Sequence, residues 1–284
     1  MSSVSLTPPA SPSAPRSVQN LRQREQRQTL LLLVCSLPLV LFLLVPLAAL
    51  LLRLSPAALL THLVQPQVAQ AIGLSMATTI LTLGITLVVG TPVGYLLARG
   101  HFRGRQVLDT LIDLPMVLPP AVAGIALLLA FGRRGIWGQY LSSAGIDIAF
   151  TQTAVILAQL FVASPFYVKA AAAGFSAIDH DLEQAAALDG ASNWQIFRLI
   201  TLPLAGTTLL GGAVMTWARA LGEFGATIIF AGNFPGRTQT MPLAIYLGFE
   251  LDLNVALTLA VILLAASFLV LLVVKGILGQ RVRL

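Results

Sequence analysis

Long stretches without Asp, Glu, Lys or Arg alternate with short charged segments along this chain. A helix of about 20 apolar residues is long enough to cross the hydrocarbon core of a bilayer. The pattern therefore predicts six membrane-spanning helices, at residues 29–52, 71–97, 114–132, 148–168, 202–230 and 253–274. Arg219 and Glu223 interrupt the fifth. In the second, Gly90 and Gly94 form a pair of small residues one helical turn apart, which favours close contact with another helix.

The first 28 residues lack this pattern. They are rich in Ser and Pro, and Arg22, Arg24 and Arg27 precede the first apolar run. Because such a segment has too little apolar surface to fold, we predict a disordered cytoplasmic tail at residues 1–28 and a transmembrane domain at residues 29–284. A basic segment before an apolar run also fits a cleaved signal peptide. We favour a retained helix, because the run is longer than the apolar region of about 7–15 residues in a signal peptide.

The distribution of Lys and Arg predicts the orientation. With six spans, the N-terminal tail, residues 98–112, residues 169–203 and the C-terminus lie on one side of the membrane, and they carry most of the basic residues. Loops rich in Lys and Arg remain in the cytoplasm. Both termini are therefore predicted to be cytoplasmic.

Composition agrees with a membrane protein and excludes several other classes. Hydrophobic residues make up 57% of the chain and charged residues only 10%, with a mean hydropathy of +0.87. A soluble chain carries about 25% charged residues, so a soluble enzyme is excluded. The net charge of +6 is spread between apolar blocks rather than gathered in one patch, which argues against nucleic acid as a partner. A single cysteine, Cys35, excludes an intrachain disulfide and a multi-cysteine zinc site.

The long predicted cytoplasmic loop contains two short helical patterns. Asp181 and Glu183 stand in the first turn of the first pattern, where carboxylates are favourable against the helix dipole. Gly190 can adopt the positive φ that ends a helix. A second amphipathic helix is expected at residues 191–198. Pro203 is expected to mark a new start of the chain's helical structure where the chain enters the membrane.

In the second pattern Trp194 and Phe197 are three residues apart and can share a helix face. Exposed aromatic side chains are typical of surfaces that bind another protein. They are equally typical of an interfacial helix whose rings lie among lipid headgroups. The residues alone leave both interpretations open.

Residues 181–203 resemble the EAA loop of ABC importer permeases, whose pattern is Glu-Ala-Ala, three residues, Gly, nine residues, Ile, one residue, Leu-Pro. The positions of this pattern are occupied by Gln184, Ala185, Ala186, Gly190, Ile200, Leu202 and Pro203. Gln184 departs from it, because the pattern has a Glu there and the charge for an ion pair is lost. The resemblance covers roughly residues 68–275. It implies an all-α membrane protein with the type I ABC importer permease fold.

In that family the loop inserts into a groove of a cytoplasmic ATPase subunit. The resemblance therefore implies a coupling role for the following residues: Glu183, Gln184, Ala185, Ala186, Gly190, Trp194, Phe197, Ile200, Leu202 and Pro203. It also implies that the partner subunit hydrolyses ATP. We accordingly expect no cofactor, metal site or catalytic residue in this chain.

A second block, residues 218–227 and 231–246, looks like the molybdate branch of these permeases, with the sulfate branch close to it. The resemblance implies import of an oxyanion by alternating access, with molybdate as the expected substrate and tungstate or sulfate and thiosulfate as alternatives. Further expected partners are a periplasmic or lipid-anchored binding protein and a second copy of the permease in a homodimer. The expected location is a prokaryotic inner membrane.

Two alternatives belong to other classes. A secondary transporter or channel that needs no ATPase would require an ion site near the middle of the membrane, and only Glu223 comes close. An intramembrane enzyme would require clustered His or acidic residues within the spans, and none cluster. His62, His101 and His180 are far apart and show no metal-ligand spacing.

Three charged residues in the last third of the chain can be interpreted as either functional or purely structural. Arg219 and Glu223 are four residues apart, so they can pair on one helix face. They either line the translocation path or hold helices together, and we favour the structural pair. Arg237 lies in a predicted outer loop beside Pro235 and Gly236. It could contact a substrate-delivering protein, but a lone loop arginine is more often solvated. The segment 232–238 departs from the ATP-binding loop pattern and is rejected as a nucleotide site.

Overall fold

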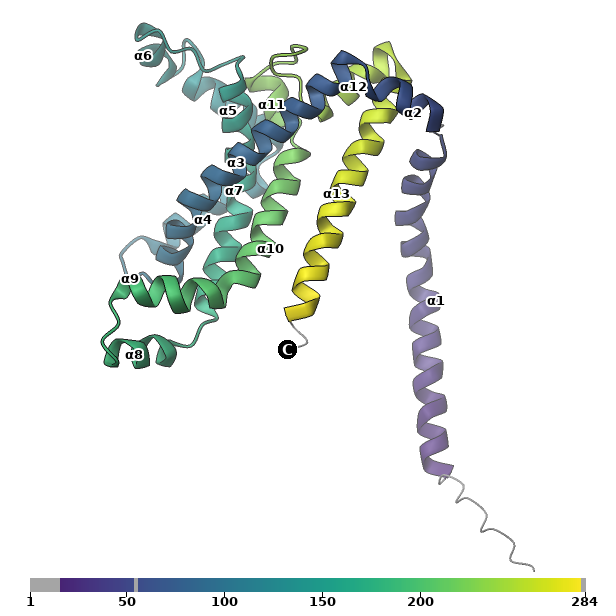
Figure 1. Cartoon of the computed structure of the whole chain (residues 1–284), viewed down its shortest axis with the longest axis vertical. Coiled ribbons are helices and arrows are strands. Elements are labelled where there is room, and N and C mark those ends of the chain that lie inside the picture. Colours follow the sequence, from purple (N-terminus) through teal and green to yellow (C-terminus); the bar gives the residue numbers. More distant parts are fainter. Residues whose placement is uncertain (1–15, 54–55, 282–284) are drawn as a thin grey trace, which may run out of the picture. The chain divides into compact units, whose positions relative to one another are not determined.

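The computed structural model describes residues 16–53 and 56–281, and the only regular elements among them are helices (Figure 1). They are α1 (Arg16–Arg53), α2 (Pro56–Leu63), α3 (Pro66–Arg99), α4 (Arg105–Val117), α5 (Pro120–Phe131), α6 (Gly138–Ser143), α7 (Gln152–Ser176), α8 (His180–Leu188), α9 (Asn193–Ile196), the π-helix η1 (Phe197–Thr201), α10 (Leu202–Leu221), α11 (Gly225–Phe230), α12 (Met241–Leu251) and α13 (Leu253–Arg281). The chain forms two units, residues 1–53 and 54–284.

The first unit contains α1, whose segment Leu31–Arg53 is long and apolar enough to cross a membrane. The helix begins at Arg16. The predicted tail boundary at residue 28 is therefore wrong, because residues 16–28 are helical. The rest of the predicted tail, residues 1–15, lies outside the described residues.

The core of the second unit is formed by α3, α7 and α10, which pack side by side (Figure 1). Close approach of α3 and α7 depends on small residues. A Cβ atom on Gly94 would lie 2.6 Å from the Cβ of Ala171, and one on Gly90 would lie 2.9 Å from Cδ1 of Tyr167. The helix contact predicted from this glycine pair is confirmed.

Buried hydrogen bonds also join α3 to α7. Thr82 donates to Oε1 of Gln159 at 3.0 Å, and Nε2 of Gln159 donates to Thr78 at 3.2 Å. All three side chains are buried. Polar residues inside a membrane stabilise helix pairs in this way, because water is not there to satisfy them.

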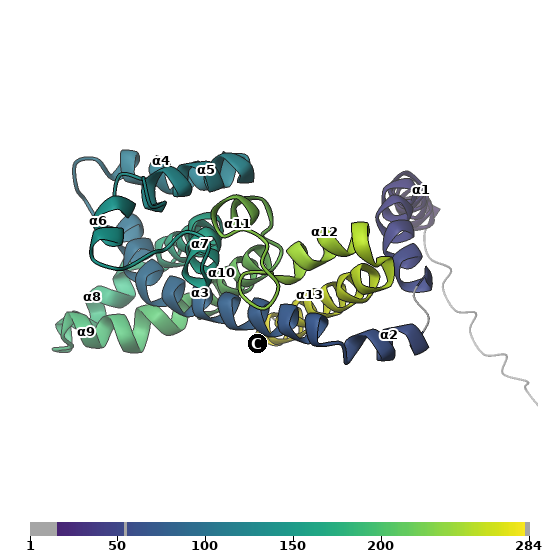
Figure 2. The same cartoon turned by 90° about the horizontal axis from the view of Figure 1, so that it is seen from above.

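In the part of the chain that the structure describes, five helices are long and apolar enough to span a membrane, or six if the bent pair α4 and α5 counts as one span. The predicted third span, residues 114–132, is not one straight helix. The axes of α4 and α5 differ by 115° at a break that contains Pro119, and Pro120 is the first residue of α5. Both helices contact α7 and lie beside it in Figure 2. Proline cannot donate the backbone hydrogen bond that a continuing helix needs, which explains the break.

The predicted fifth span, residues 202–230, is also interrupted. Helix α10 ends at Leu221, and α11 starts at Gly225 after a short turn. The pattern of apolar residues missed α12, which is too short to span a membrane and begins with a Met-Pro pair. The spans predicted at 71–97 and 253–274 lie within α3 and α13, and the one at 148–168 is displaced toward the C-terminus in α7.

Candidate functional site

The segment between α7 and α10 begins with α8, which forms as the sequence predicts. Asp179 is its N-cap, and its carboxylate accepts a hydrogen bond from the backbone N–H of Asp181 at 3.0 Å. Asp181 and Glu183 lie in the first turn. Gly190 follows the helix with a φ of +89°. This is the left-handed conformation expected of a glycine that ends a helix.

The second helix differs from the prediction in its extent. A capping box formed by Ser192 and Gln195 starts α9 at Asn193, and the backbone then remains helical through η1 into α10. The expected restart at Pro203 is therefore wrong. In η1 the N–H of Leu202 donates to the carbonyl of Phe197, five residues earlier. This wider turn directly precedes Pro203, which lacks an N–H and lies in the first turn of α10.

Glu183 connects this segment to the rest of the chain through polar contacts. Its Oε1 atom lies 3.4 Å from Nη2 of Arg99 and accepts a hydrogen bond of 2.8 Å from the hydroxyl of Thr201. Arg99 is the last residue of α3, and its Nη2 atom also donates to the carbonyl of Ile178 at 2.9 Å. Gln184, at the acidic position of the loop pattern, is exposed. The acid that pairs inside the chain is therefore the neighbouring Glu183.

Phe197 anchors the segment in the core. Its ring contacts Tyr95 at a centroid distance of 5.3 Å and Phe175 at 6.2 Å. On the other side it stacks on Trp194 at 5.7 Å, so the expected sharing of a face by these two aromatic residues is confirmed. Trp194 is 66% exposed and Leu188 is 90% exposed. Two large apolar side chains thus project from a firmly anchored segment.

The remaining residues of the loop pattern fall into two groups. Ala185 and Pro203 are exposed, whereas Ala186, Ile200 and Leu202 are half-buried. Arg99 and Thr201 carry the polar contacts of the segment, yet the sequence analysis did not select them. The only signal was their position, because Arg99 ends a long apolar run and Thr201 lies inside the loop pattern.

Arg219 and Glu223 lie at the opposite end of α10 from this segment (Figure 1). Nη1 of Arg219 lies 2.7 Å from Oε2 of Glu223. Glu223 follows the end of α10, so the pair does not share one helix face as expected. Its Oε1 atom instead accepts a hydrogen bond of 2.8 Å from the N–H of Ala226 and thereby caps α11. Glu223 is 1% exposed, and the side chain of Arg219 is 30% exposed.

Arg237 lies in the turn before α12 and is exposed. Its backbone N–H donates to the carbonyl of Phe234 at 3.0 Å. Its guanidinium makes no ion pair with any residue that the structure describes. Within the same described ranges, no three His, Cys, Asp or Glu side chains are placed to hold a metal ion.

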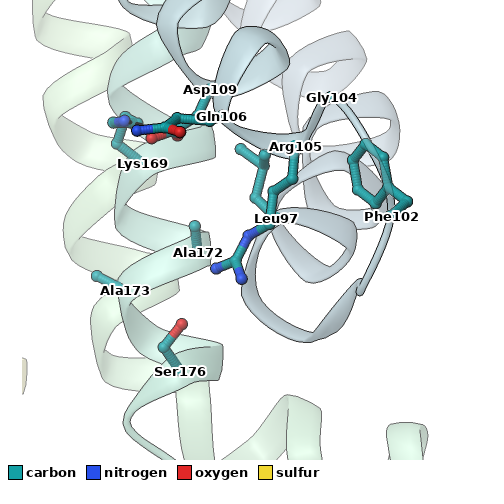
Figure 3. A pocket seen from close by; sticks show the side chains of 10 residues that line it. All are labelled: Leu97, Phe102, Gly104, Arg105, Gln106, Asp109, Lys169, Ala172, Ala173 and Ser176. Carbon is teal, nitrogen blue, oxygen red and sulfur yellow. Dashed lines mark hydrogen bonds and ion pairs between the residues drawn. The ribbon is translucent and has the colours of Figure 1, made fainter.

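A cavity of about 700 Å³ lies between the start of α4 and the last turns of α7 (Figure 3). Lys169 contributes to its wall and lies 2.8 Å from Asp109 and 2.9 Å from Asp113, both on α4. Figure 3 shows the guanidinium of Arg105 and the hydroxyl of Ser176 facing the same space. The sequence analysis missed this cluster, because it placed residue 169 at the start of a loop, whereas Lys169 lies within α7.

In the region between α5 and α7, Arg133 pairs with Asp147 at 2.8 Å. The hydrogen bond from Arg133 lowers the pKa of Asp147 below its ordinary value of 3.8, and a second hydrogen bond from Ser142 acts in the same direction. Both charged side chains are substantially exposed. Exposed pairs of this kind contribute little to stability.

Comparison with known proteins identifies close relatives. Residues 90–284 match the family described as the binding-protein-dependent transport system inner membrane component. The molybdenum transport system permease protein ModB of Mycobacterium tuberculosis is 40% identical over 233 residues, which cover 82% of this chain and 88% of the relative. The sulfate transport system permease protein CysW of Synechococcus elongatus is 36% identical over 212 residues, covering 75% of this chain and 74% of the relative.

The fold also matches that of a solved transporter. A bacterial alginate ABC transporter in complex with an alginate pentasaccharide-bound periplasmic protein aligns with a TM-score of 0.68 and 18% identity. The alignment covers 92% of this chain and 96% of that one.

Proposed function

The chain belongs to the family of binding-protein-dependent transport system inner membrane components, in its molybdate and sulfate branch, and we propose that it imports molybdate into the cytoplasm as the permease subunit of an ABC importer. The observation that carries this proposal is the 40% identity to molybdenum permeases over most of the chain. Tungstate has the same charge and shape and is a second candidate. Sulfate or thiosulfate is a third, because the sulfate permease is almost as similar.

The energy comes from a separate ATPase that docks at the segment α8–η1. The support for this site is its geometry, in which Trp194 and Leu188 are exposed while Phe197 fixes the segment to the core. Large exposed aromatic and aliphatic side chains on a rigid support are typical of protein-binding hot spots. ATP hydrolysis belongs to the partner, so this chain itself makes and breaks no covalent bond.

The proposed mechanism is alternating access, and the continuity of the helix supports it. Because α9, η1 and α10 form one uninterrupted helical segment, a force applied at Trp194 reaches the far end of α10 without an intervening loop. ATP binding draws two such segments together and opens the pathway outward, where a periplasmic or lipid-anchored binding protein releases the oxyanion. Two copies of the permease are proposed to enclose the pathway in a bacterial inner membrane.

An ATPase-independent secondary transporter is the less favoured candidate. It would need an acidic group that is free to bind a coupling ion within the membrane. The carboxylate of Glu223 has both oxygens engaged, one by Arg219 and one by the N–H of Ala226.

The test is reconstitution in proteoliposomes with the ATPase and the molybdate-binding protein, followed by uptake of labelled molybdate. Uptake is expected to require ATP and to be competed by unlabelled tungstate more strongly than by sulfate. Stronger competition by sulfate would assign the protein to sulfate transport. Uptake without the ATPase would refute the ABC mechanism.

A paired substitution tests the docking site. Trp194→Ala is expected to lower copurification of the ATPase, because it removes an exposed anchor. Trp137→Ala is the matched control, since Trp137 is 63% exposed and lies beside α6, at the end of the second unit opposite α8 and α9 (Figure 1). Equal loss of the ATPase in both variants would contradict the proposed docking site.

A further inference from the structure

Helix α8 has no buried residue, so apolar packing does little to hold it in place. Its firm attachments are instead polar, and they converge on Glu183. The side chain of Glu183 is only 14% exposed. A carboxylate removed from water to this extent is costly unless charged or hydrogen-bonding partners compensate it.

Within α8, Nδ1 of His180 lies 3.5 Å from Oε2 of Glu183, and the other partners of Glu183 come from two other elements of the core. Arg99 belongs to the end of α3, and its own side chain is 10% exposed. Thr201, which is fully buried, belongs to the turn that leads into α10. One carboxylate therefore joins α8 to α3 and to the start of α10.

Arg99 is itself held in a fixed orientation. Its Nη2 atom donates to the carbonyl of Ile178, just before α8, and its Nη1 atom lies 2.6 Å from Nε2 of His180, the first residue of α8. The planar guanidinium thus contacts three successive points at the start of α8. Such a fork geometry specifies orientation better than a single ammonium group does.

We propose that Arg99, Glu183 and Thr201 form a latch of positioning residues that transmits displacement of α8 to α3 and α10 during transport. The proposal rests on the proposed function, in which an ATPase moves this segment. It assigns the transmitting acid to Glu183, whereas Gln184, at the acidic position of the family pattern, points to the exposed surface. Without the latch, the ATPase would displace α8 without displacing α3 and α10.

The first test measures coupling in the reconstituted complex with the ATPase and the binding protein. Arg99→Gln and Glu183→Gln are each expected to lower molybdate uptake per ATP hydrolysed by about tenfold, within the range typical of coupling between sites. The double variant is expected to lose much less than the product of the two single losses, because both substitutions remove the same contact between Arg99 and Glu183. Losses that multiply in the double variant would refute the latch.

Matched variants separate positioning from general damage. Arg103→Gln removes an exposed arginine just after the end of α3 and is expected to leave coupling unchanged. Thr201→Ser keeps the hydroxyl that donates to Glu183, whereas Thr201→Val removes it with little change in volume. Retained coupling in the serine variant and reduced coupling in the valine variant support the latch. Equal coupling in both variants counts against it.

The second test needs neither substrate nor ATPase. Backbone amides of residues 180–188 in the purified permease are expected to exchange with deuterium about tenfold faster in Arg99→Gln than in the wild type, while those of α7 are unchanged. Unchanged exchange in α8 would refute the latch even if the wild-type complex imports molybdate. Faster exchange confined to α8 would support it even if the wild-type complex imports nothing, and that second result would refute the proposed function alone.

Discussion

The ion pair of Arg219 and Glu223 gives the sharpest test of how charges are held in this protein. The two partners are unequally buried, since Glu223 is 1% exposed and the side chain of Arg219 is 30% exposed. Arg219→Met leaves a buried carboxylate without a cation. By analogy with buried ion pairs, this substitution should lower the free energy of unfolding by about 3–5 kcal/mol.

Substitution of the other partner should lower the free energy of unfolding by less. In Glu223→Gln the amide oxygen can still accept the hydrogen bond from Ala226, and the guanidinium of Arg219 can reach water. The main loss is one hydrogen bond between charged groups, with a cost near the lower end of about 1.5–3 kcal/mol because Arg219 is partly solvated. The structure therefore predicts that Arg219→Met is the more damaging variant, by about 2 kcal/mol.

The double variants refine this prediction. Arg219→Met combined with Glu223→Gln should recover part of the loss, because no unpaired charge remains. Arg219→Met combined with Glu223→Leu should recover less, since the buried N–H of Ala226 then has no acceptor, at a cost of about 1–3 kcal/mol.

The measurement is unfolding of each purified variant in mixed micelles with increasing SDS, combined with uptake in proteoliposomes. If Arg219→Met were no less stable than Glu223→Gln, the argument from unequal burial would be wrong. Normal stability of both single variants, with uptake lost only in the Arg219 variant, would instead place the arginine in the translocation path.

Three further predictions concern other parts of the chain. Gly190→Val should lower the free energy of unfolding by about 1–2 kcal/mol through its positive φ alone, because no atom lies within 4 Å of the added Cβ. The variant should lower ATP-driven uptake without affecting membrane insertion, and full uptake would contradict the role of this turn. Cysteines at Ser192 and Gly236, in a background without the native cysteine, should react with an impermeant reagent from opposite faces, and labelling of both from outside intact cells would overturn the topology. Arg133→Gln should raise the pKa of Asp147 toward 3.8, as measured by NMR titration, and an unchanged pKa would refute the assigned cause. Because the pKa of Asp147 is lowered in the folded state, the stabilising contact is present above pH 3.8 and is lost as the pH falls through the lowered value.

The sequence by itself determined the features that depend on local composition. Uninterrupted apolar runs predicted where α3 and α13 cross the membrane, because a bilayer requires a helix of about 20 apolar residues whatever its neighbours are. Gly190 was predicted to end a helix because its backbone freedom is a property of one residue. The pairing of Arg219 with Glu223 followed from their short separation in the chain.

The tertiary structure decided what depends on residues far apart in the sequence. The spacing of the loop pattern pointed to position 184, where Gln184 carries no charge, and only the fold shows that Glu183 meets Arg99 from the distant end of α3. Likewise, only the packing of α4 against α7 shows that Lys169 pairs with Asp109 and Asp113. The physical reason is common to both cases. A charged side chain inside or near a membrane must find a partner because desolvation is costly, but the choice of partner depends on how the helices pack, which no local pattern specifies.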